Sequence, residues 1–327
     1  MAAEPGTRVS KADIEAIEAA ARCLAAGGLV AFPTETVYGL GADAGNGEAV
    51  ARLYAAKGRP SFNPLIAHVP DIDTARRVAN FTSAAERLAA VFWPGPLTLV
   101  LRRRTDPGLS LLASAGLETV ALRAPAHSVA QQLLRKAGRP VAAPSANRSG
   151  RVSPTMAAHV AAELGAEVSL VVDGGACPVG LESTILDLTS RVPVLLRPGA
   201  VTREELVTVF GEIASPSASD HVPRAPGSLP SHYAPSRPVR LDVREARPGE
   251  ALLAFGAEAP AGFVEVIFLS RTGDLAEAAA NLFASLRRID RPEFSGIAVM
   301  PIPEHGLGLA INDRLRRAAF REPDANA

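Results

Sequence analysis

The sequence predicts an α/β protein with two domains, and three observations support this class. The chain has 327 residues, which corresponds to about two domains at roughly 150 residues each. Hydrophobic residues make up 47% and charged residues 21%, so the chain has enough apolar side chains to bury a core. Short β-rich runs alternate with segments of helical periodicity, which is typical of sheets flanked by helices.

The first 212 residues hold most of the predicted elements. Ile14, Ile17, Ala21 and Leu24 recur at helical spacing, and Gly27-Gly28 ends this helix. Further helices are expected over Glu48–Lys57, from a Ser83/Glu86 capping box to Pro94, over Ser128–Lys136 and Thr155–Leu164, and from a Thr202/Glu205 capping box through Phe210. Strands are expected at Leu29–Phe32, Leu97–Arg103, Thr119–Arg123, Pro140–Asn147, Val168–Asp173, Ser183–Thr189 and Val192–Arg197, the last two as a hairpin.

The composition changes after residue 212. Residues 213–238 contain six prolines and six serines in 26 positions, which indicates a linker. Order then resumes, with strands expected at Ala251–Phe255, Phe263–Leu269 and Gly296–Met300 and helices at Asp274–Ile289 and Leu309–Ala319. The sequence therefore predicts a first domain over residues 1–212, a linker over 213–238, and a small α/β domain with a largely parallel sheet over 239–327.

Charge and motifs exclude several classes of function. Lys plus Arg and Asp plus Glu are both 34, so a global electrostatic grip on nucleic acid is excluded and only a local basic site remains. Two cysteines cannot form a disulfide framework, and no apolar run is long enough for a signal peptide or a membrane span, so we expect a cytoplasmic protein. Gly39-Leu-Gly41 does not follow its strand directly, which argues against a dinucleotide fingerprint, and no His or Cys spacing indicates zinc.

Polar and basic residues gather at strand ends and in loops rich in Gly and Pro, where sites are usually built. Lys57 and Arg59 are two residues apart, as are Ser145 and Asn147, and in an extended chain this spacing places two side chains on one face. Together the two pairs fit a phosphate cradle, because Arg binds phosphate oxygens bidentately and Lys adds a point charge. Arg123 and Arg197 at strand ends supply more positive charge.

Each residue taken singly also has a purely structural explanation. Lys57 fits the C-terminus of a helix, where a cation is favourable, and Arg59 fits an ordinary surface site. Ser145 and Asn147 are common turn formers, and His68 after an apolar run fits a hydrogen-bonded core histidine. Thr34 and Thr36 suit a turn, as does Asp173 before two glycines.

Taken together, the segments resemble one family. PTETVYGLG (Pro33–Gly41), K-x-R at Lys57, NPL-x-x-H ending at His68, WPGPLT, S-x-N at Ser145, SPT, DGG, EST and RPG occur in the order found in the YrdC-type threonylcarbamoyl-AMP synthases. The match covers about 170 residues, from Leu29 to Gly199. SHYAP at Ser231 and PEHGLGLAINDRLRRA at Pro303 resemble the linker and C-terminal domain of the longer, two-domain members.

The resemblance implies a fold and a reaction. The fold is a twisted mixed sheet with flanking helices around a deep basic cavity, followed by a small Rossmann-like domain. The reaction makes L-threonylcarbamoyl-AMP from L-threonine, bicarbonate and ATP, with Mg²⁺ accompanying ATP and pyrophosphate released. A partner transferase complex then delivers the group to tRNAs that read codons starting with A, and weak binding of tRNA itself stays open. The carbamate and the phosphates are all anions, so the protein must supply mainly cationic neutralisation and positioning.

The family motifs also imply roles for individual residues. Lys57 and Arg59 are the implied catalytic residues. The implied ATP contacts are Lys57, Arg59, Asn63, Thr119, Ser145, Asn147, Ser153 and Arg197. The implied threonine contacts are Thr36, His68, Arg123, Ala143 and Ser183. No residue is assigned to a protein-held metal.

One stretch departs from the family pattern. The linker reads PGSLPSHYAP, with Pro230 where a nucleotide-contacting tyrosine is usual and Ser228 in place of a methionine. We therefore expect this segment to act as a lid pinned by His232 and Tyr233, covering the cavity without hydrogen-bonding the nucleotide. Two other functions remain as alternatives: a non-catalytic RNA-binding protein that uses the same basic cavity, and a carbamoyl-handling domain like those inside larger maturation enzymes.

Overall fold

The larger of two sheets is mixed, which confirms the predicted fold class. The computed structural model describes residues 8–106, 108–216 and 232–320, and the lid segment with Ser228 and Pro230 lies mostly outside these ranges. Within them the sheet has the strand order β1-β8-β2-β3-β7-β4-β6-β5-β9-β10. The strands are β1 (Val9–Lys11), β2 (Val30–Phe32), β3 (Gly39–Asp43), β4 (Ile66–His68), β5 (Leu97–Arg102), β6 (Thr119–Arg123), β7 (Val141–Ala142), β8 (Leu170–Asp173), β9 (Thr184–Asp187) and β10 (Val194–Arg197).

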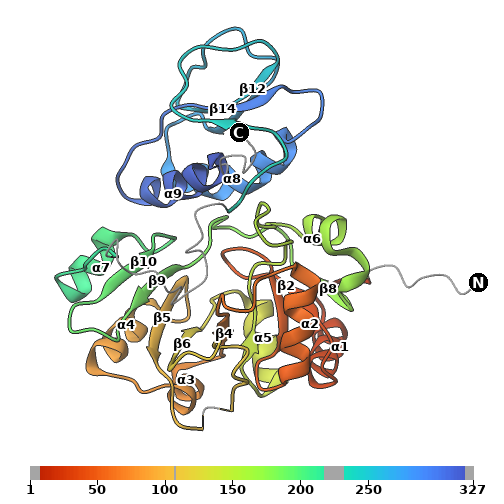
Figure 1. Cartoon of the computed structure of the whole chain (residues 1–327), viewed down its shortest axis with the longest axis vertical. Helices are drawn as coiled ribbons and strands as arrows, with labels where there is room; N and C mark the ends of the chain where they lie inside the picture. The colour runs from red at the N-terminus through yellow and green to blue at the C-terminus, as the bar shows by residue number, and fades with distance from the viewer. Residues whose placement is uncertain (1–7, 107, 217–231, 321–327) are drawn as a thin grey trace, which may run out of the picture.

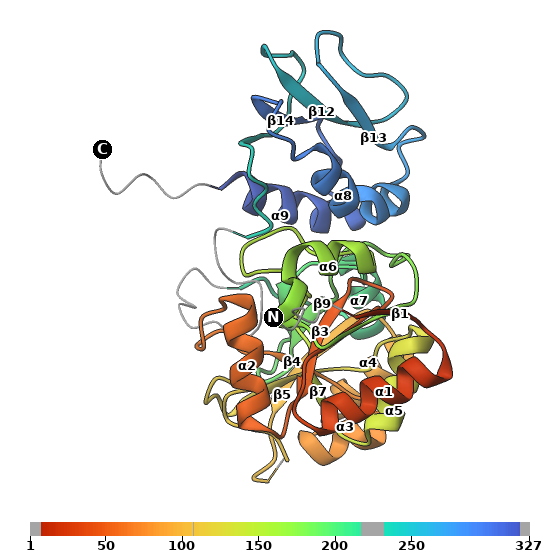
Figure 2. The same ribbon diagram turned by 90° about the vertical axis from the view of Figure 1, so that its right-hand side faces the viewer.

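Helices cover both faces of one half of this sheet (Figures 1 and 2). On one face α1 (Ile14–Ala25) and α5 (Ser128–Ala137) pack on Val30 and Phe32 of β2. On the other face α2 (Gly47–Lys57) and α6 (Ala157–Leu164) share a core with Ala31 of the same strand. The other half is covered by α3 (Ile72–Val78), α4 (Ser83–Phe92) and α7 (Arg203–Phe210), and a short 3₁₀ helix (Gly165–Glu167) follows α6.

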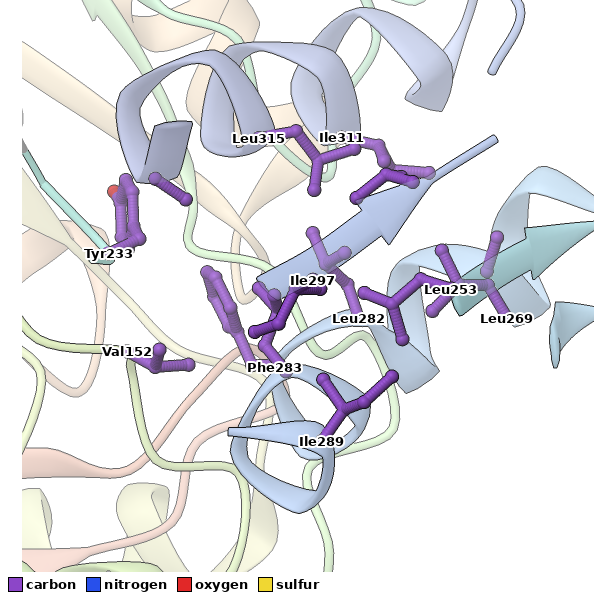
Figure 3. Close-up of a cluster of buried hydrophobic side chains, with 14 of the residues drawn as sticks. Val152, Tyr233, Leu253, Leu269, Leu282, Phe283, Ile289, Ile297, Ile311 and Leu315 are labelled. Carbon is purple, nitrogen blue, oxygen red and sulfur yellow. The ribbon is translucent and has the colours of Figure 1, made fainter. Parts of the chain in front are cut away.

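The second sheet is small and entirely parallel in the part of the chain that the structure describes, as the sequence predicted. Its order is β11 (Val239–Arg240), β14 (Gly296–Val299), β12 (Glu250–Phe255) and β13 (Val266–Ser270). Helices α8 (Leu275–Ile289) and α9 (Leu307–Ala319) lie between this sheet and the first domain (Figures 1 and 2). Their apolar core continues into the first domain through Val152 and Tyr233, which lie beside Phe283 of α8 (Figure 3).

Some elements differ from the sequence prediction. Helix α4 is capped by Thr82, whose side chain accepts a hydrogen bond from the amide of Ala85, so the predicted Ser83 cap is wrong by one residue. Ile14 begins α1 but is 71% exposed and does not belong to its buried face. Strands β1, β3, β4 and β11 and helix α3 were not predicted. For β3 the reason is steric: a side chain at Gly41 would meet Phe32 at 2.8 Å and Val141 at 3.0 Å, so a residue without a β-forming side chain is required there.

The backbone of Gly180 in the first domain lies close against α8. A Cβ atom at this position would lie 2.5 Å from the Cα and carbonyl oxygen of Ala280 and 2.6 Å from the carbonyl oxygen of Ala279. These are backbone atoms of a helix and cannot move aside cheaply. Gly180 also has a φ of +73°, which disfavours other residues.

We predict that Gly180→Ala destabilises the packing of the two domains. The matched control is Gly175→Ala in the same loop, where φ is +86° but a Cβ would meet nothing within 4 Å. Both substitutions carry the same backbone strain, so their difference isolates overpacking, which costs about 1–3 kcal/mol. Chemical unfolding should show Gly180→Ala to be less stable than Gly175→Ala by this amount. Equal stabilities of the two variants would mean that the loop accommodates the added methyl group at position 180 without a cost in stability.

Candidate functional site

Strand alternation gathers polar side chains on one face of the larger sheet. Ala67 of β4, Leu122 of β6 and Leu99 of β5 face the core beneath α3, α4 and α7. The side chains that alternate with them therefore point to the opposite face, and they include His68, Arg123 and Thr98. The parallel register of β4 and β6 sets His68 beside Arg123.

A pocket opens on this face. It encloses about 480 Å³ of empty space, part of it open to solvent. Its walls come from the loop between β2 and β3, the ends of β4, β6 and β7, the loop before β9, the end of β10 and the segment that leads to the second domain. The lining residues are Thr36, Val37, Arg59, Ile66, His68, Arg123, Ala143, Pro144, Ser145, Glu182, Ser183, Arg197, His232 and Tyr233.

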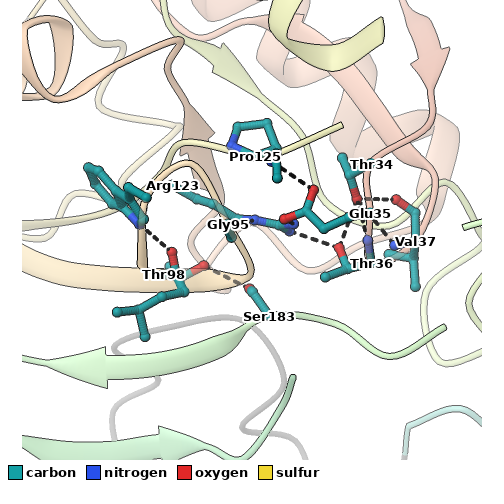
Figure 4. A network of polar contacts seen from close by, with 12 residues as sticks. Thr34, Glu35, Thr36, Val37, Gly95, Thr98, Arg123, Pro125 and Ser183 are labelled. Atoms are coloured by element: carbon teal, nitrogen blue, oxygen red, sulfur yellow. Dashed lines mark hydrogen bonds and ion pairs between the residues drawn. The ribbon is translucent and has the colours of Figure 1, made fainter. Parts of the chain in front are cut away.

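Arg123 lines the pocket and is held by a buried ion pair with Glu35 (Figure 4). Its Nη2 donates to Glu35 Oε1 at 2.6 Å and its Nη1 donates to Thr36 Oγ1 at 2.9 Å. The second oxygen of Glu35 accepts from the amide of Ala126, so the carboxylate is anchored on both sides. Burial alone would raise the pKa of Glu35, but the charge of Arg123 outweighs it and the pKa is lowered. Glu35 therefore stays ionised and fixes the guanidinium.

Two further guanidiniums point into the pocket from carbonyl cradles. Arg59 donates to the carbonyl oxygens of Asn63 and Pro64, at 3.2 and 2.9 Å. Arg197 donates to the carbonyl oxygen of Ser183 from Nε and Nη2, at 3.1 and 2.9 Å. Burial lowers the pKa of Arg59 to about 10, so it remains charged at neutral pH. A carbonyl satisfies a donor without cancelling its charge, and this arrangement suits an anion.

Glu182 is a carboxylate that lines the same pocket. It is 6% exposed, and its Oε1 accepts from Ser153 Oγ at 2.6 Å. Its Oε2 accepts from Nε of Arg314, a fully buried residue of α9, at 2.9 Å. Burial alone would raise the pKa of Glu182, but the charges of Arg314 and Arg197 hold it at about 2.

Lys57 does not line the pocket. It ends α2, and Gly58 follows it in the left-handed region with a φ of 58°, so the expectation of an extended K-x-R pair on one face is wrong. The Lys57 ammonium donates to the backbone carbonyls of Ser145, at 2.5 Å, and Asn147. Lys57 therefore holds the backbone of the S-x-N motif, Ser145 to Asn147, in place. Burial, followed by the charge of Arg59, lowers the pKa of Lys57 to about 7.

Of the residues implied by the family motifs, eight line the pocket: Thr36, Arg59, His68, Arg123, Ala143, Ser145, Ser183 and Arg197. His68 is neutral because burial lowers its pKa to about 3. The others lie behind the lining. Asn147 donates to the carbonyls of Arg148 and Arg151, Ser153 bonds Glu182, and Thr119 begins β6 at the end opposite Arg123. Asn63 offers its backbone carbonyl to Arg59 and Tyr54.

Sequence reasoning missed the carboxylates and the contribution of the second domain. Glu35 and Glu182 lie inside the motifs PTET and EST, but nothing local showed that each has a buried arginine partner. Arg314 lies in the NDRLRRA segment, where it looks like any charged residue of an amphipathic helix. His232 and Tyr233, expected as anchors of the linker, form part of the pocket wall itself.

Comparisons with known proteins agree with this geometry. Residues 22–199 match the family described as "Telomere recombination", and residues 201–320 match the family "Threonylcarbamoyl-AMP synthase, C-terminal domain". The chain is 42% identical to the threonylcarbamoyl-AMP synthase of Bacillus subtilis, covering 93% of this chain and 92% of that one. It is 43% identical to that of Pyrococcus abyssi, covering 93% and 94%. The chain belongs to the threonylcarbamoyl-AMP synthase family.

A solved structure supports the same assignment. The crystal structure of Pyrococcus abyssi Sua5 complexed with L-threonine superposes with a TM-score of 0.87 at 40% identity, covering 96% of both chains. The resemblance seen in the sequence is thus confirmed for both domains. As a member of this family, the chain is a nucleotidyltransferase that makes threonylcarbamoyl-AMP for tRNA modification. Among the described residues, no helix combines the length and the apolar character that a membrane span requires.

We predict that Lys57 gives this protein a pH-dependent stability. In the unfolded chain a lysine keeps its proton up to about pH 10.5, whereas folded Lys57 releases it near pH 7. Between these values the unfolded state binds more protons, so the free energy of unfolding should rise with pH. The unfolding free energy of the wild type minus that of Lys57→Met should therefore increase from pH 7 to pH 9.

The control for this measurement is Lys136→Met, which removes a half-exposed lysine paired with Glu18. This variant accounts for the general effect of losing one positive charge. If the wild type and Lys57→Met differ by a constant amount across this pH range, the two carbonyls keep Lys57 charged in the folded state.

Proposed function

We propose that the pocket joins L-threonine, bicarbonate and ATP to give L-threonylcarbamoyl-AMP and pyrophosphate. The observation that carries the proposal is the set of three buried guanidiniums, Arg59, Arg123 and Arg197, around one cavity. Every substrate carries a negative charge, and the reaction brings a carbamate to a phosphate. Fixed cations in the lining of the cavity offset this repulsion, which is strong at low dielectric.

Arg123 is the proposed seat of the threonine carboxylate. A guanidinium has five N–H donors, and three atoms of Arg123 already donate to Gly95, Thr36 and Glu35. Two N–H groups remain, and Arg123 lines the pocket together with His68, Ser183 and Ala143. The crystallised Pyrococcus abyssi Sua5 binds L-threonine, and at 40% identity the same amino acid is expected here.

Arg59, Arg197 and Ser145 are the proposed direct contacts of ATP. Arg59 and Arg197 are the proposed contacts of the phosphates, and Ser145 lines the pocket wall. Lys57 acts through the loop that it holds, so its proposed role is positioning. Asn63, Asn147 and Ser153 shape the same wall from behind, while Thr119 is placed farthest from Arg123 along β6 and is the weakest of the proposed ATP contacts.

Mg²⁺ is proposed to enter with ATP as part of the substrate. Among the described residues, no group of three or more His, Cys, Asp or Glu side chains is placed to hold a metal ion. The two carboxylates near the pocket, Glu35 and Glu182, are each engaged by an arginine. The phosphates themselves are then the main ligands, and the metal adds positive charge to the same cradle.

The proposed chemistry balances without an acidic catalyst from the protein. The threonine amine and bicarbonate form a carbamate and water. A carbamate oxygen attacks the α-phosphorus, the bond from this phosphorus to the bridging oxygen of the β-phosphate breaks, and pyrophosphate leaves. Arg59 and Arg197 hold the phosphates while Arg123 holds the nucleophile, so the protein contributes orientation and charge.

The further partners proposed are those of the pathway that the product implies. The mixed anhydride passes to a tRNA-threonylcarbamoyl transferase complex, and a cytoplasmic location fits a supply of ATP and tRNA. Direct tRNA binding without catalysis remains the second function to test.

The decisive experiment is release of pyrophosphate by the purified full-length protein. Release from ATP should require both L-threonine and bicarbonate, and a product with the mass of threonylcarbamoyl-AMP should appear in equal amount. Serine in place of threonine is the control for side-chain specificity. Pyrophosphate release that is independent of threonine, or tight tRNA binding with no release, would overturn the proposal.

We predict that Arg123→Ala raises the KM for threonine by about a hundredfold and changes the KM for ATP far less. The reason is that the substitution removes a charged hydrogen bond to the threonine carboxylate but no proposed contact with ATP. Because Arg123→Ala also leaves Glu35 buried without its partner, the matched variant is Arg123→Ala with Glu35→Gln. The double variant should be more stable than Arg123→Ala but should have an equally high KM for threonine. Equal effects on both KM values would assign Arg123 to the phosphates.

A further inference from the structure

Glu182 is an unexpected charge in a pocket built for anions. It lines the same cavity as Arg59 and Arg197, and an ionised carboxylate there opposes any phosphate that enters. A free Glu182 would also be the natural partner for Arg197. Yet within residues 8–106, 108–216 and 232–320, Arg197 donates hydrogen bonds only to Ser183, through the backbone carbonyl and the hydroxyl.

The second domain supplies the cation that Glu182 needs. Arg314 of α9 is 0% exposed and donates to Glu182 from Nε, and its Nη1 donates to the carbonyl of Pro198 and to Asp313. Pro198 directly follows Arg197, so one guanidinium contacts both the carboxylate and the backbone that carries the pocket arginine. Burial alone would lower the pKa of Arg314, but Tyr233, Glu182 and Asp313 around it outweigh burial and raise the pKa, so Arg314 keeps its charge.

The same arginine supports the segment that closes the pocket wall. Its guanidinium carbon lies 5.4 Å from the centre of the Tyr233 ring, and Tyr233 stacks on Phe283 of α8. The amide of His232 donates to the carbonyl of Arg317, one turn further along α9. Residues of α9 thus contact three parts of the pocket: Glu182, the backbone after Arg197, and His232-Tyr233.

We infer that Arg314 is a positioning residue for the synthesis reaction, and that it keeps Arg197 available to ATP by neutralising Glu182 from the second domain. The inference rests on the proposed function, because it assumes that Arg197 contacts the phosphates. Without Arg314, Glu182 pairs with Arg197 and the phosphate cradle loses one cation while keeping one anion. The second domain is then needed for ATP binding.

The experiment compares Arg314→Met with Arg314→Met plus Glu182→Gln in the full-length protein. Arg314→Met should raise the KM for ATP by about tenfold or more and the KM for threonine far less, since Arg123 keeps its own carboxylate partner, Glu35. Removing the carboxylate charge as well should restore most of the ATP affinity. Glu182→Gln alone should change the KM for ATP much less than Arg314→Met does. If Arg314 served stability alone, the double variant would restore the free energy of unfolding, and neither variant would change the KM for ATP relative to the KM for threonine.

Two further variants separate charge from packing. Arg314→Lys keeps the positive charge and should stay close to wild type in ATP affinity. Arg316→Met removes an exposed arginine of the same helix, paired with Glu304, and should leave both KM values unchanged. Equal defects in Arg314→Lys and Arg314→Met, or a defect that persists in the double variant, would overturn the inference.

Two readouts keep the test decisive. If Arg314→Met does not fold, Glu182→Gln tests the inference by itself. A large rise in its KM for ATP would show that Glu182 itself serves the substrate and would overturn the inference. Binding of ATP measured directly by calorimetry separates affinity from turnover. Absence of threonine-dependent pyrophosphate release in the wild type would instead overturn the proposed function, so the two failures are distinguishable.

Discussion

Buried positive charge around one pocket is the constraint on which the rest of this structure depends. Arg59, Arg123 and Arg197 are all less than one tenth exposed, and a buried guanidinium is stable only when its donors are satisfied. The protein solves this in two ways. Carbonyl oxygens hold Arg59 and Arg197 and leave their charge intact, whereas Glu35 holds Arg123 by an ion pair. The pocket therefore combines fixed geometry with a surplus of positive charge.

Polar and apolar contacts around the pocket also join the two domains. The loop that brings Glu182 to the pocket also contains Gly180, whose backbone touches α8, and Glu182 itself reaches Arg314 of α9. Apolar contacts of Val152 and Tyr233 with the core of the second domain surround these polar links. Separating the two domains would therefore leave a buried carboxylate without its cation.

Local signals predicted most elements, and their failures have a steric or long-range cause. Helix α7 carries the predicted Thr202/Glu205 capping box, and β9 and β10 form the predicted hairpin, since both depend on neighbours in sequence. Strand β3 was missed because Phe32 and Val141 require glycine at position 41. The extended interpretation of the K-x-R spacing, by contrast, conflicted with a local signal: the helix predicted over Glu48–Lys57 already includes Lys57, and α2 does end there before the chain turns at Gly58.

By itself the sequence determined the fold class, the family and the side chains of the pocket that stand at strand ends, such as His68, Arg123 and Arg197. These follow from periodicity and from motifs that are continuous along the chain. Only the tertiary structure decided which charges neutralise one another. Glu35 and Arg123 are 88 residues apart, and Glu182 and Arg314 are 132 apart. Ion pairs between such distant positions carry no local pattern, because the partner is selected by packing and burial, and these exist only after the chain has folded.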